Sequence, residues 1–281
     1  MVASGVMALP LGAAKREALT LRVLSAAVLA PVAICAAWLG GALLAALITL
    51  AAAVMGWEWG RLADRGRFGT AGVLVAVTEV AGVGVAAVGW PMAALGVLAV
   101  GASARFLWPS AEGGASLWAG VGTLWIGAAC TALVYLGTDP VTGRATLLWL
   151  FALVWATDSA AYLVGRKVGG PRLAPIWSPK KTWSGALAGV VAAGLVGLVT
   201  ANILGISMLS PVCWISLGLS VAAQAGDLAE SAAKRRFGAK DASGLIPGHG
   251  GLLDRLDGLL AAAAVAAALT LARGASPVVW S

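Results

Sequence analysis

The sequence predicts an all-α, polytopic membrane protein with about nine transmembrane helices and a cytoplasmic N-terminus. Of the 281 residues, 60% are hydrophobic and only 11% are charged, whereas an average soluble domain carries roughly 25% charged residues. The mean hydropathy is +0.92. Because a helix needs about 20 mainly apolar residues to cross a bilayer, helices are expected wherever apolar runs of about that length occur.

Nine apolar runs are candidates for these helices. The second, fourth and eighth are shorter than a full span. Glycine occurs 38 times, as expected where transmembrane helices pack closely through small residues. The runs are 21 to 39, 41 to 56, 71 to 89, 91 to 107, 117 to 136, 145 to 164, 185 to 206, 210 to 226 and 256 to 273.

The distribution of basic residues predicts how the helices are oriented. With the N-terminus in the cytoplasm, all but two of the 19 Lys and Arg residues fall in cytoplasmic segments, which leaves Arg144 and Arg273 outside. This positive-inside asymmetry supports the odd number of helices. It also places the two long polar loops, 165–184 and 227–255, in the cytoplasm, where they are expected to meet and form a site.

Composition argues against two other classes of protein. The net charge of +7 could indicate a nucleic-acid-binding protein. The bases lie on the predicted cytoplasmic face, however, where anionic lipid headgroups and soluble phosphates explain them, so no nucleic acid partner is expected. Cys35, Cys130 and Cys213 stand singly in apolar runs without C-x-x-C spacing, so neither disulfides nor a zinc site is expected.

The first candidate functional segment follows the eighth run and reads QAGDLAESAAKRR. If the helix continues into the cytoplasm, Asp227, Ser231 and Lys234 lie on one face at i, i+4 and i+7. These side chains can hold a hard cation and phosphate oxygens together, since Mg²⁺ prefers a few carboxylates plus water and substrate phosphate. A solvated helix end with incidental charges would contain the same residues, so this face alone leaves both interpretations open.

The second candidate segment, GAKDASGLIPGHGGLLDRLDG, is rich in glycine. Its glycines permit a tight backbone whose N–H groups can converge on an anion. Asp254 and Asp257 follow at i, i+3 where the ninth run begins, so both can face the pocket that contains Asp227. His249 could bind phosphate or transfer a proton, although an isolated histidine is more often structural. Positive charge comes from Lys240 and Arg255, and the glycines are Gly244, Gly248, Gly250 and Gly251.

The third candidate segment lies in the first polar loop. Asp158, near the cytoplasmic end of the sixth run, is costly in a membrane unless it is paired or functional. The sequence SPKKT at 178–182 supplies Lys180 and Lys181, which are suited to neutralising a polyphosphate, although a positive-inside loop would also explain them. Glu79, inside the third run, is a further intramembrane acid without an identifiable partner. No Walker A loop, nucleophilic serine elbow or H-E-x-x-H helix is present. The acids, hydroxyl and ammonium groups of the three segments make metal-assisted phosphoryl or nucleotidyl transfer the candidate chemistry.

These segments resemble the signature of the phosphatidate cytidylyltransferases, the CDP-diacylglycerol synthases. Upstream, Asp158, Tyr162, Gly165 and the SPKKT segment are also similar to that family, so the motifs cover roughly the C-terminal half. Ser184 is a departure, because many members carry a glutamate there. The signature residues are Ser231, Lys234, Arg235, Lys240, Asp241, Pro247, His249, Gly250, Gly251, Asp254, Arg255 and Asp257.

The resemblance implies transfer of the cytidylyl group of CTP to phosphatidic acid, with release of pyrophosphate. It implies Mg²⁺ held by Asp227 and Asp254, a monovalent cation such as K⁺ beside it, and a homodimer in the inner cell membrane. Residues expected to act in catalysis are Asp227, Lys234, Lys240, Asp241, His249, Asp254, Arg255 and Asp257. Residues expected to bind substrate or cofactor are Asp158, Ser178, Lys180, Lys181, Thr182, Ser231, Arg235, Gly250 and Gly251.

A single membrane domain is expected over 1–281, with mainly N-terminal transmembrane helices in 1–144 and the catalytic helices and cytoplasmic loops in 145–281. One alternative is a CTP-dependent lipid kinase of the dolichol or phytol kinase type, which has a similar C-terminal motif but transfers the γ-phosphoryl group. Another is a cation transporter whose path is lined by Glu79, Asp158 and Asp227. The clustering of acids at one membrane face argues against transport.

Overall fold

The computed structural model describes residues 11–64, 66–67, 69–107, 115–207, 211–246, 248 and 250–280. Nine α-helices, one short 3₁₀ helix and one two-stranded sheet make up its regular structure, which confirms the all-α prediction. The helices are α1 (Leu11–Leu39), α2 (Gly41–Ala63), α3 (Thr70–Ala87), α4 (Pro91–Leu107), α5 (Ala115–Gly137), α6 (Gly143–Val168), α7 (Trp183–Leu204), α8 (Pro211–Arg236), α9 (Leu253–Arg273) and η1 (Pro277–Val279). The strands are β1 (Arg172–Ala174) and β2 (Ser178–Thr182).

Each apolar run corresponds to a helix, but two runs predicted to be short are long. The second run continues to Ala63 and the eighth to Arg236, because both helices extend beyond their apolar part into charged turns. Six helices, α2 and α5 to α9, are long and apolar enough to cross a membrane. In the described parts of α1, α3 and α4 the apolar stretches are shorter, Leu24–Leu39, Gly72–Ala87 and Pro91–Leu107.

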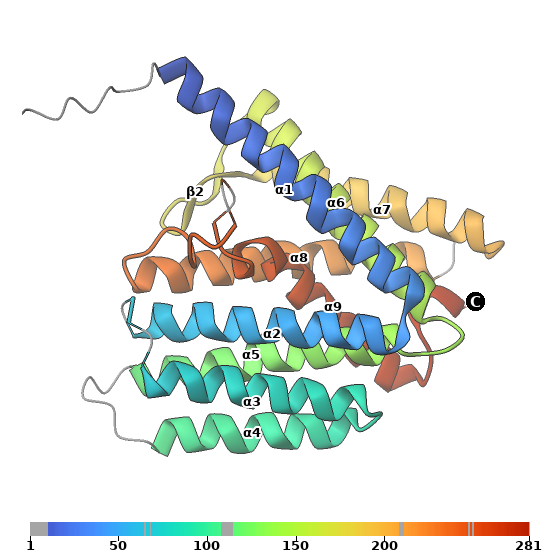
Figure 1. Ribbon diagram of the computed structural model, residues 1–281. Coiled ribbons are helices and arrows are strands. Elements are labelled where there is room, and N and C mark those ends of the chain that lie inside the picture. The colour runs from blue at the N-terminus through green and yellow to red at the C-terminus, as the bar shows by residue number, and fades with distance from the viewer. Residues whose placement is uncertain are drawn as a thin grey trace, which may run out of the picture.

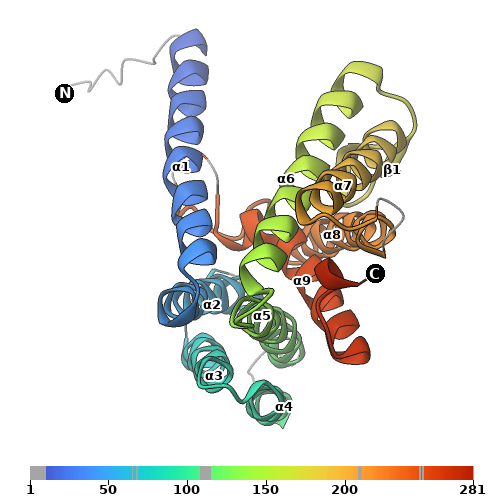
Figure 2. The same ribbon diagram turned by 90° about the vertical axis from the view of Figure 1, so that its right-hand side faces the viewer.

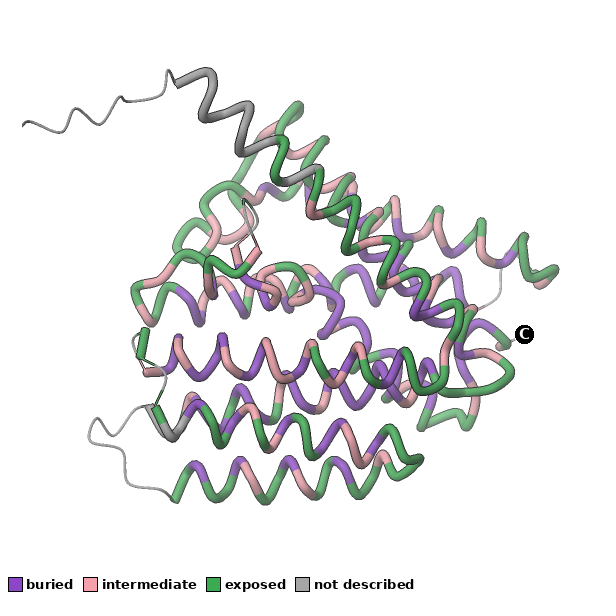
Figure 3. The backbone as a smooth tube through the Cα atoms, viewed as in Figure 1, coloured by how far each residue is buried: buried purple, intermediate pink, exposed green. Residues whose placement is uncertain are grey.

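The helices form two packed groups (Figures 1 and 2). Helices α2 to α5 pack against one another in chain order, as do α6 to α9, and the two groups meet where α5 and α2 contact α9. Helix α1 lies at the periphery and crosses α2 and α6. Figure 3 shows the buried residues concentrated between the groups, while α1 and α7 expose much of their surface. Exposed apolar helix faces of this kind are suited to contact with lipid tails.

Successive helices run in opposite directions, so the connecting segments gather at two ends of the molecule (Figure 1). One end carries the β1–β2 hairpin and the segment 237–252. The other end carries the α3–α4 turn, the α5–α6 turn and the start of α8. Among the described residues, only Arg144 and Arg273 are basic at the second end. The basic residues at the first end are Arg61, Arg67, Arg105, Arg166, Lys167, Arg172, Lys180, Lys181, Lys234, Arg235, Arg236, Lys240 and Arg255.

Polar contacts and close backbone approach hold α6, α7 and α8 together. Thr157 Oγ1 donates to Ser220 Oγ at 2.9 Å, and Gln224 Nε2 donates to the Ala186 carbonyl at 3.3 Å. At the α6–α7 crossing, a Cβ added to Gly185 would lie 2.6 Å from the Ala161 carbonyl oxygen. The glycine therefore lets the backbones approach, as small residues do at membrane helix interfaces.

Replacing Gly185 with alanine should destabilise the protein by about 1–3 kcal/mol, because the new methyl group meets backbone that cannot rotate away. Gly218 on α8 is a matched control: an added Cβ there meets nothing within 4 Å, so Gly218→Ala should be neutral or slightly stabilising. Thermal unfolding in detergent would compare the variants. Equal midpoints for Gly185→Ala and wild type would contradict the packing argument.

Candidate functional site

The segments that carry the predicted site residues, so far as the structure describes them, meet at the end of the molecule that carries the β1–β2 hairpin (Figure 1). Four parts of the chain supply them: the last turns of α6, strand β2, the last turns of α8, and the segment 237–252 with the start of α9. The prediction that the two long polar loops meet is thus confirmed. The connection is direct, since β2 and α8 are joined by an ion pair between Lys181 and Asp227.

Asp254 organises the glycine-rich segment. Its Oδ1 pairs with the Lys234 ammonium, and its Oδ2 accepts hydrogen bonds from the backbone N–H groups of Ala242 at 2.8 Å and Gly251 at 2.7 Å. The Asp254 side chain is only 3% exposed. Both of its oxygens therefore have donors within the protein, and this carboxylate fixes the path of the segment leading into α9.

Lys234 lies between two carboxylates. Besides Asp254 it pairs with Glu230, one helical turn earlier on α8, and the Glu230 side chain is fully buried. Glu230 was not among the predicted site residues, although its i, i+4 spacing from Lys234 could have indicated the pair. Since a buried charge needs partners, this triad couples α8 rigidly to α9.

Asp227 and Lys181 form a more open pair. Lys181 Nζ lies 2.5 Å from Asp227 Oδ2, and their side chains are 25% and 33% exposed. Ser231 Oγ lies 3.4 Å from Asp227 Oδ1 and donates a long hydrogen bond to it, which confirms that the two side chains share a helix face. Because both side chains are accessible, their ion pair can open, and the ammonium and the carboxylate can each contact a ligand instead.

Two further acids surround this pair. Asp158 interacts electrostatically with Asp227, Lys181 and Arg255, and Asp257 interacts with Asp227 and Asp158. Asp257 Oδ1 accepts a hydrogen bond from the Gly258 N–H at 2.7 Å. Three acidic side chains thus lie close enough to interact electrostatically beside one lysine and one arginine. Such a region favours the binding of a cation.

The donor set fits Mg²⁺ in part. Among the residues that the structure describes, no three His, Cys, Asp or Glu side chains are placed to bind an ion by themselves. A site built from few carboxylates, water and substrate phosphate does not require three. Asp227 is accessible for this role, whereas Asp254 would have to give up a contact with Lys234 or with a backbone N–H.

The glycine-rich segment is closed by backbone pairing. Gly250 and Ile246 exchange N–H···O=C bonds of 3.1 and 2.8 Å. Gly250 has a φ of +88°, and a Cβ there would lie 2.9 Å from Asp254 Oδ2, so a side chain would displace the carboxylate. Asp241, Lys240 and Arg255 are exposed on or beside this segment. His249 and Pro247, predicted to take part, lie outside the described residues.

Glu58 is a site-supporting residue that the sequence analysis missed. This fully buried residue of α2 accepts hydrogen bonds from Ser243 Oγ at 2.6 Å, from the Leu252 N–H at 2.9 Å and from the Leu253 N–H at 2.7 Å. It therefore satisfies the amides that begin α9 and places negative charge at the positive end of the helix dipole. The signal in the sequence is an acid between two tryptophans, WEW, at the end of an apolar run.

Other predicted binding residues make structural contacts. Thr182 caps α7, since its Oγ1 accepts the Gly185 N–H at 3.2 Å. Arg235 donates from Nε to the Trp177 carbonyl at 3.4 Å and from Nη1 to the Ala239 carbonyl at 3.2 Å. Ser178 and Lys180 lie on β2, with Lys180 exposed. Ser184, where the resemblance departs, donates to the Gly169 carbonyl at 2.5 Å. Roles of these residues in substrate binding stay predictions.

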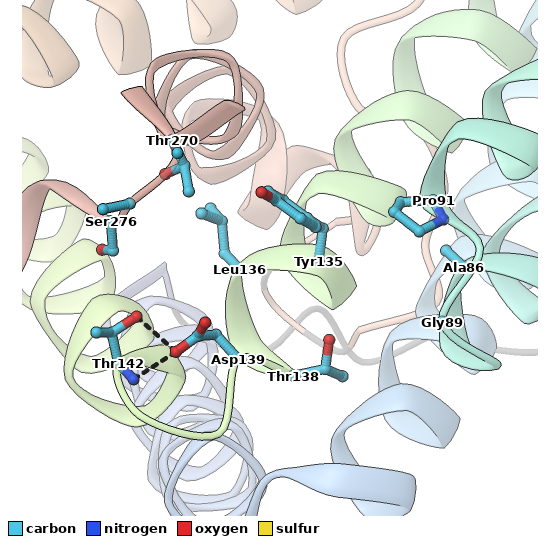
Figure 4. Close-up of a pocket in the computed structure, with 12 residues that line it drawn as sticks. Ala86, Gly89, Pro91, Tyr135, Leu136, Thr138, Asp139, Thr142, Thr270 and Ser276 are labelled. Atoms are coloured by element: carbon cyan, nitrogen blue, oxygen red, sulfur yellow. Dashed lines mark hydrogen bonds between the residues drawn. The ribbon is translucent and has the colours of Figure 1, made fainter. Parts of the chain in front are cut away.

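A cavity of about 250 Å³ lies at the opposite end of α6 and α9 (Figure 4). Its lining includes Tyr135, Asp139, Thr142 and Ser276 but none of the predicted site residues. Asp139 Oδ1 accepts the Thr142 N–H at 2.6 Å and the Val141 N–H at 3.0 Å. These bonds, the one from Thr142 foremost, lower the pKa of Asp139 below its usual value. The cavity is separate from the candidate site.

Comparisons with known proteins match this site and most of the chain. The model of a family described as "Cytidylyltransferase family" matches residues 20–272. A protein of Brucella suis named phosphatidate cytidylyltransferase is 48% identical over 162 residues, which cover 56% of this chain and 57% of that protein. Proteins of the same name from Haemophilus influenzae and Rickettsia bellii are 42% identical over 129 residues (44% and 45% covered) and 37% identical over 152 residues (52% and 65% covered). The aligned part thus spans little more than half of the Brucella relative.

Replacing Glu58 with glutamine should increase hydrogen exchange at the amides of Leu252 and Leu253, because one of the two carboxylate oxygens that accept these hydrogen bonds becomes an N–H₂ donor. Hydrogen–deuterium exchange followed by mass spectrometry would measure this.

Glu79→Gln is the matched control for that experiment. Glu79 is also fully buried, but neither of its carboxylate oxygens has a hydrogen-bond partner among the described residues. Its replacement should leave exchange at Leu252 and Leu253 unchanged. Equal protection of these amides in both variants would show that Glu58 does not hold the start of α9.

Proposed function

This chain belongs to the cytidylyltransferase family, and we propose that it transfers the cytidylyl group of CTP to phosphatidic acid, giving CDP-diacylglycerol and pyrophosphate for phospholipid biosynthesis. The observation that carries the proposal is the accessible Lys181–Asp227 pair beside the Lys234–Asp254 pair, at one end of helices able to span a membrane. Both pairs lie within the segment that matches the family. The names of the curated relatives supply the acceptor, phosphatidate.

The proposed reaction needs positioning and charge neutralisation rather than a protein nucleophile. A phosphate oxygen of phosphatidic acid attacks the α-phosphorus of CTP, the new P–O bond forms, and the bond to the β-phosphate breaks with release of pyrophosphate. Lys181 is accessible enough to contact a phosphate once it exchanges Asp227 for substrate. Arg255 and Lys240, exposed on the neighbouring segments, add positive charge for the leaving pyrophosphate.

Lys234 has a different proposed role. Its ammonium is enclosed by Glu230 and Asp254, so it acts first by holding the start of α9 against α8. This rigid frame keeps Asp257 and the backbone N–H groups of the glycine-rich segment at fixed distances from Asp227. Preorganisation of that kind lowers the reorganisation required at the moment of transfer.

Mg²⁺ is the proposed cofactor, held by Asp227 and, in the prediction from the resemblance, by Asp254. When bound it would neutralise phosphate oxygens and orient the polyphosphate. Support comes from the acidic side chains of Asp158 and Asp257, which interact electrostatically with Asp227. A monovalent cation such as K⁺ and a homodimeric assembly are further proposals from the family resemblance.

The site is proposed to face the cytoplasm from the inner cell membrane. Support comes from the concentration of Lys and Arg at the site's end of the described helices, against Arg144 and Arg273 at the other end. This orientation gives the site access to soluble CTP and to phosphatidic acid in the inner leaflet.

The decisive experiment uses purified protein, Mg²⁺ and phosphatidic acid in mixed micelles, with CTP labelled at the α- or the γ-phosphate. Lipid labelled only from the α position is the expected result, and chelation of Mg²⁺ should abolish it. Label that enters a lipid alcohol from the γ position would make the protein a lipid kinase. No transfer from either position would reject nucleotide chemistry and return the choice to cation transport.

Asp227→Asn and Asp254→Asn should both reduce cytidylyl transfer by about 100-fold or more, but for different reasons. The Asp227 side chain is partly exposed, so its replacement should change the free energy of unfolding by no more than about 1 kcal/mol. Asp254 is a buried partner of Lys234, so its loss should also destabilise the protein by about 3 kcal/mol. Activity assays combined with denaturant unfolding separate the two.

Asp139→Asn provides the control for these variants, since Asp139 lies at the opposite end of α6 and its amide oxygen can keep the bonds from Thr142. It should retain transfer within a few-fold of wild type. Wild-type-like turnover by Asp227→Asn at saturating Mg²⁺ would remove Asp227 from the mechanism.

A further inference from the structure

The β1–β2 hairpin exposes large apolar side chains at its tip. Arg172 pairs with Thr182 and Ala174 with Ser178 in an antiparallel register, which leaves residues 175–177 as the turn. In this turn Ile176 is 83% exposed and Trp177 is 46% exposed. A turn that faced only water would be expected to carry polar residues, so these two side chains indicate a contact with something apolar.

The hairpin and its flanks are also uniformly basic. The sequence contains no Asp or Glu from residue 159 to residue 226. Arg166 and Lys167 end α6, and Arg172 and Lys180 lie on the two strands, all of them exposed. Tyr162, near the end of α6, and Trp183, at the start of α7, add exposed aromatic side chains. Apolar, aromatic and basic groups together are the composition of a surface that contacts anionic lipid headgroups.

The hairpin is fixed to the protein at several points. Arg235 Nε donates to the Trp177 carbonyl at 3.4 Å, which ties the tip to α8. The Trp183 N–H donates to the Pro171 carbonyl at 3.1 Å, which closes the base. These two contacts hold the tip beside α8 and the base of the hairpin closed.

Strand β2 connects the tip to the candidate site. Successive side chains of a strand alternate between its faces, so Lys180 and Lys181 point to opposite sides. Lys180 is exposed, whereas Lys181 pairs with Asp227. The four residue steps from Trp177 to Lys181 span roughly 13 Å in an extended strand, so the apolar tip lies within the length of one phospholipid of the site.

We propose that the β1–β2 hairpin is an anchor in the membrane interface that binds anionic phospholipid. Ile176 and Trp177 enter the boundary between headgroups and acyl chains, and Arg172 and Lys180 contact lipid phosphates. Resting on the proposed function, the inference adds that phosphatidic acid held here is passed along β2 to Lys181. The partner is the anionic leaflet next to α6 and α7.

A first experiment tests the location of the tip without requiring activity. A bimane label is attached to Ile176→Cys in a Cys35→Ser background, where Cys130 and Cys213 remain buried. The protein is reconstituted in vesicles that contain phosphatidylglycerol and lipids brominated on the acyl chains. Strong quenching by the brominated lipids is expected at position 176. Label at Lys240→Cys, on the exposed loop, is the aqueous reference and should be quenched mainly by iodide.

The labelling result decides the anchor itself. Quenching at 176 that equals the Lys240→Cys reference with both quenchers would overturn the anchor, whatever the protein's activity. Loss of acyl-chain quenching when phosphatidylglycerol is replaced by phosphatidylcholine supports recognition of anionic headgroups. Unchanged quenching in that exchange contradicts it.

A second experiment tests delivery of the substrate. Ile176→Ser should raise the apparent KM for long-chain phosphatidic acid in vesicles by about five-fold while leaving the KM for CTP unchanged. With a short-chain, water-soluble phosphatidic acid the variant should match wild type. Val141→Ser, which alters an 87% exposed residue at the opposite end, is the control and should behave as wild type in both assays.

These outcomes separate the two proposals. An unchanged KM for long-chain phosphatidic acid in Ile176→Ser overturns delivery along β2. Absence of cytidylyl transfer in the wild type overturns the proposed function instead, and the quenching experiment still decides whether the hairpin lies in the membrane interface.

Discussion

The architecture of the site depends on how buried backbone N–H groups are satisfied where segment 237–252 enters α9. Two carboxylates accept them: Asp254 takes those of Ala242 and Gly251, and Glu58 takes those of Leu252 and Leu253. An unpaired N–H at this depth would be costly. The carboxylates occupy the space that side chains at 250 and 251 would need, since added Cβ atoms would lie 2.9 and 2.6 Å from them. The glycines are therefore required by the acids.

This arrangement divides the charged residues into a closed set and an open set. Lys234, Glu230 and Asp254 are enclosed, and any rearrangement would leave a buried charge without a partner. Lys181 and Asp227 are partly exposed, so water can replace either partner and the pair can open at small cost. The closed set fixes geometry, and the open set is able to exchange ligands. Such a combination suits a site that must bind and release polyanions.

The sequence predicted features that depend on local spacing and missed those that depend on distant contacts. The face shared by Asp227 and Ser231 follows from helical geometry, and the nine helices follow from apolar runs of sufficient length. The extension of α2 to Ala63 was missed because Glu58 and Arg61 interrupt its apolar pattern. The role of Glu58 was missed because its partners Leu252 and Leu253 lie 194 and 195 residues away in the chain. Similarly, the i, i+3 spacing of Asp254 and Asp257 allowed both to face the same pocket as Asp227. The spacing could not show that the N–H groups of Ala242 and Gly251 donate hydrogen bonds to Asp254 Oδ2.

The position of the site follows from the phases in which the proposed substrates reside. A nucleotide polyphosphate stays in water, whereas a diacyl lipid stays in the bilayer, so their reacting phosphates can meet only at the interface. The end of α8 and the start of α9 lie at that level, where helices able to span a membrane give way to polar segments. The β1–β2 hairpin lies at the same end and is joined to α8 through Arg235 and through Lys181. One short strand therefore connects the exposed apolar tip of the hairpin with the Lys181–Asp227 pair. With the proposed function, this strand would place the surface that contacts lipid next to the carboxylate that binds the cation, which gives a basic hairpin a purpose in a chain built otherwise of helices.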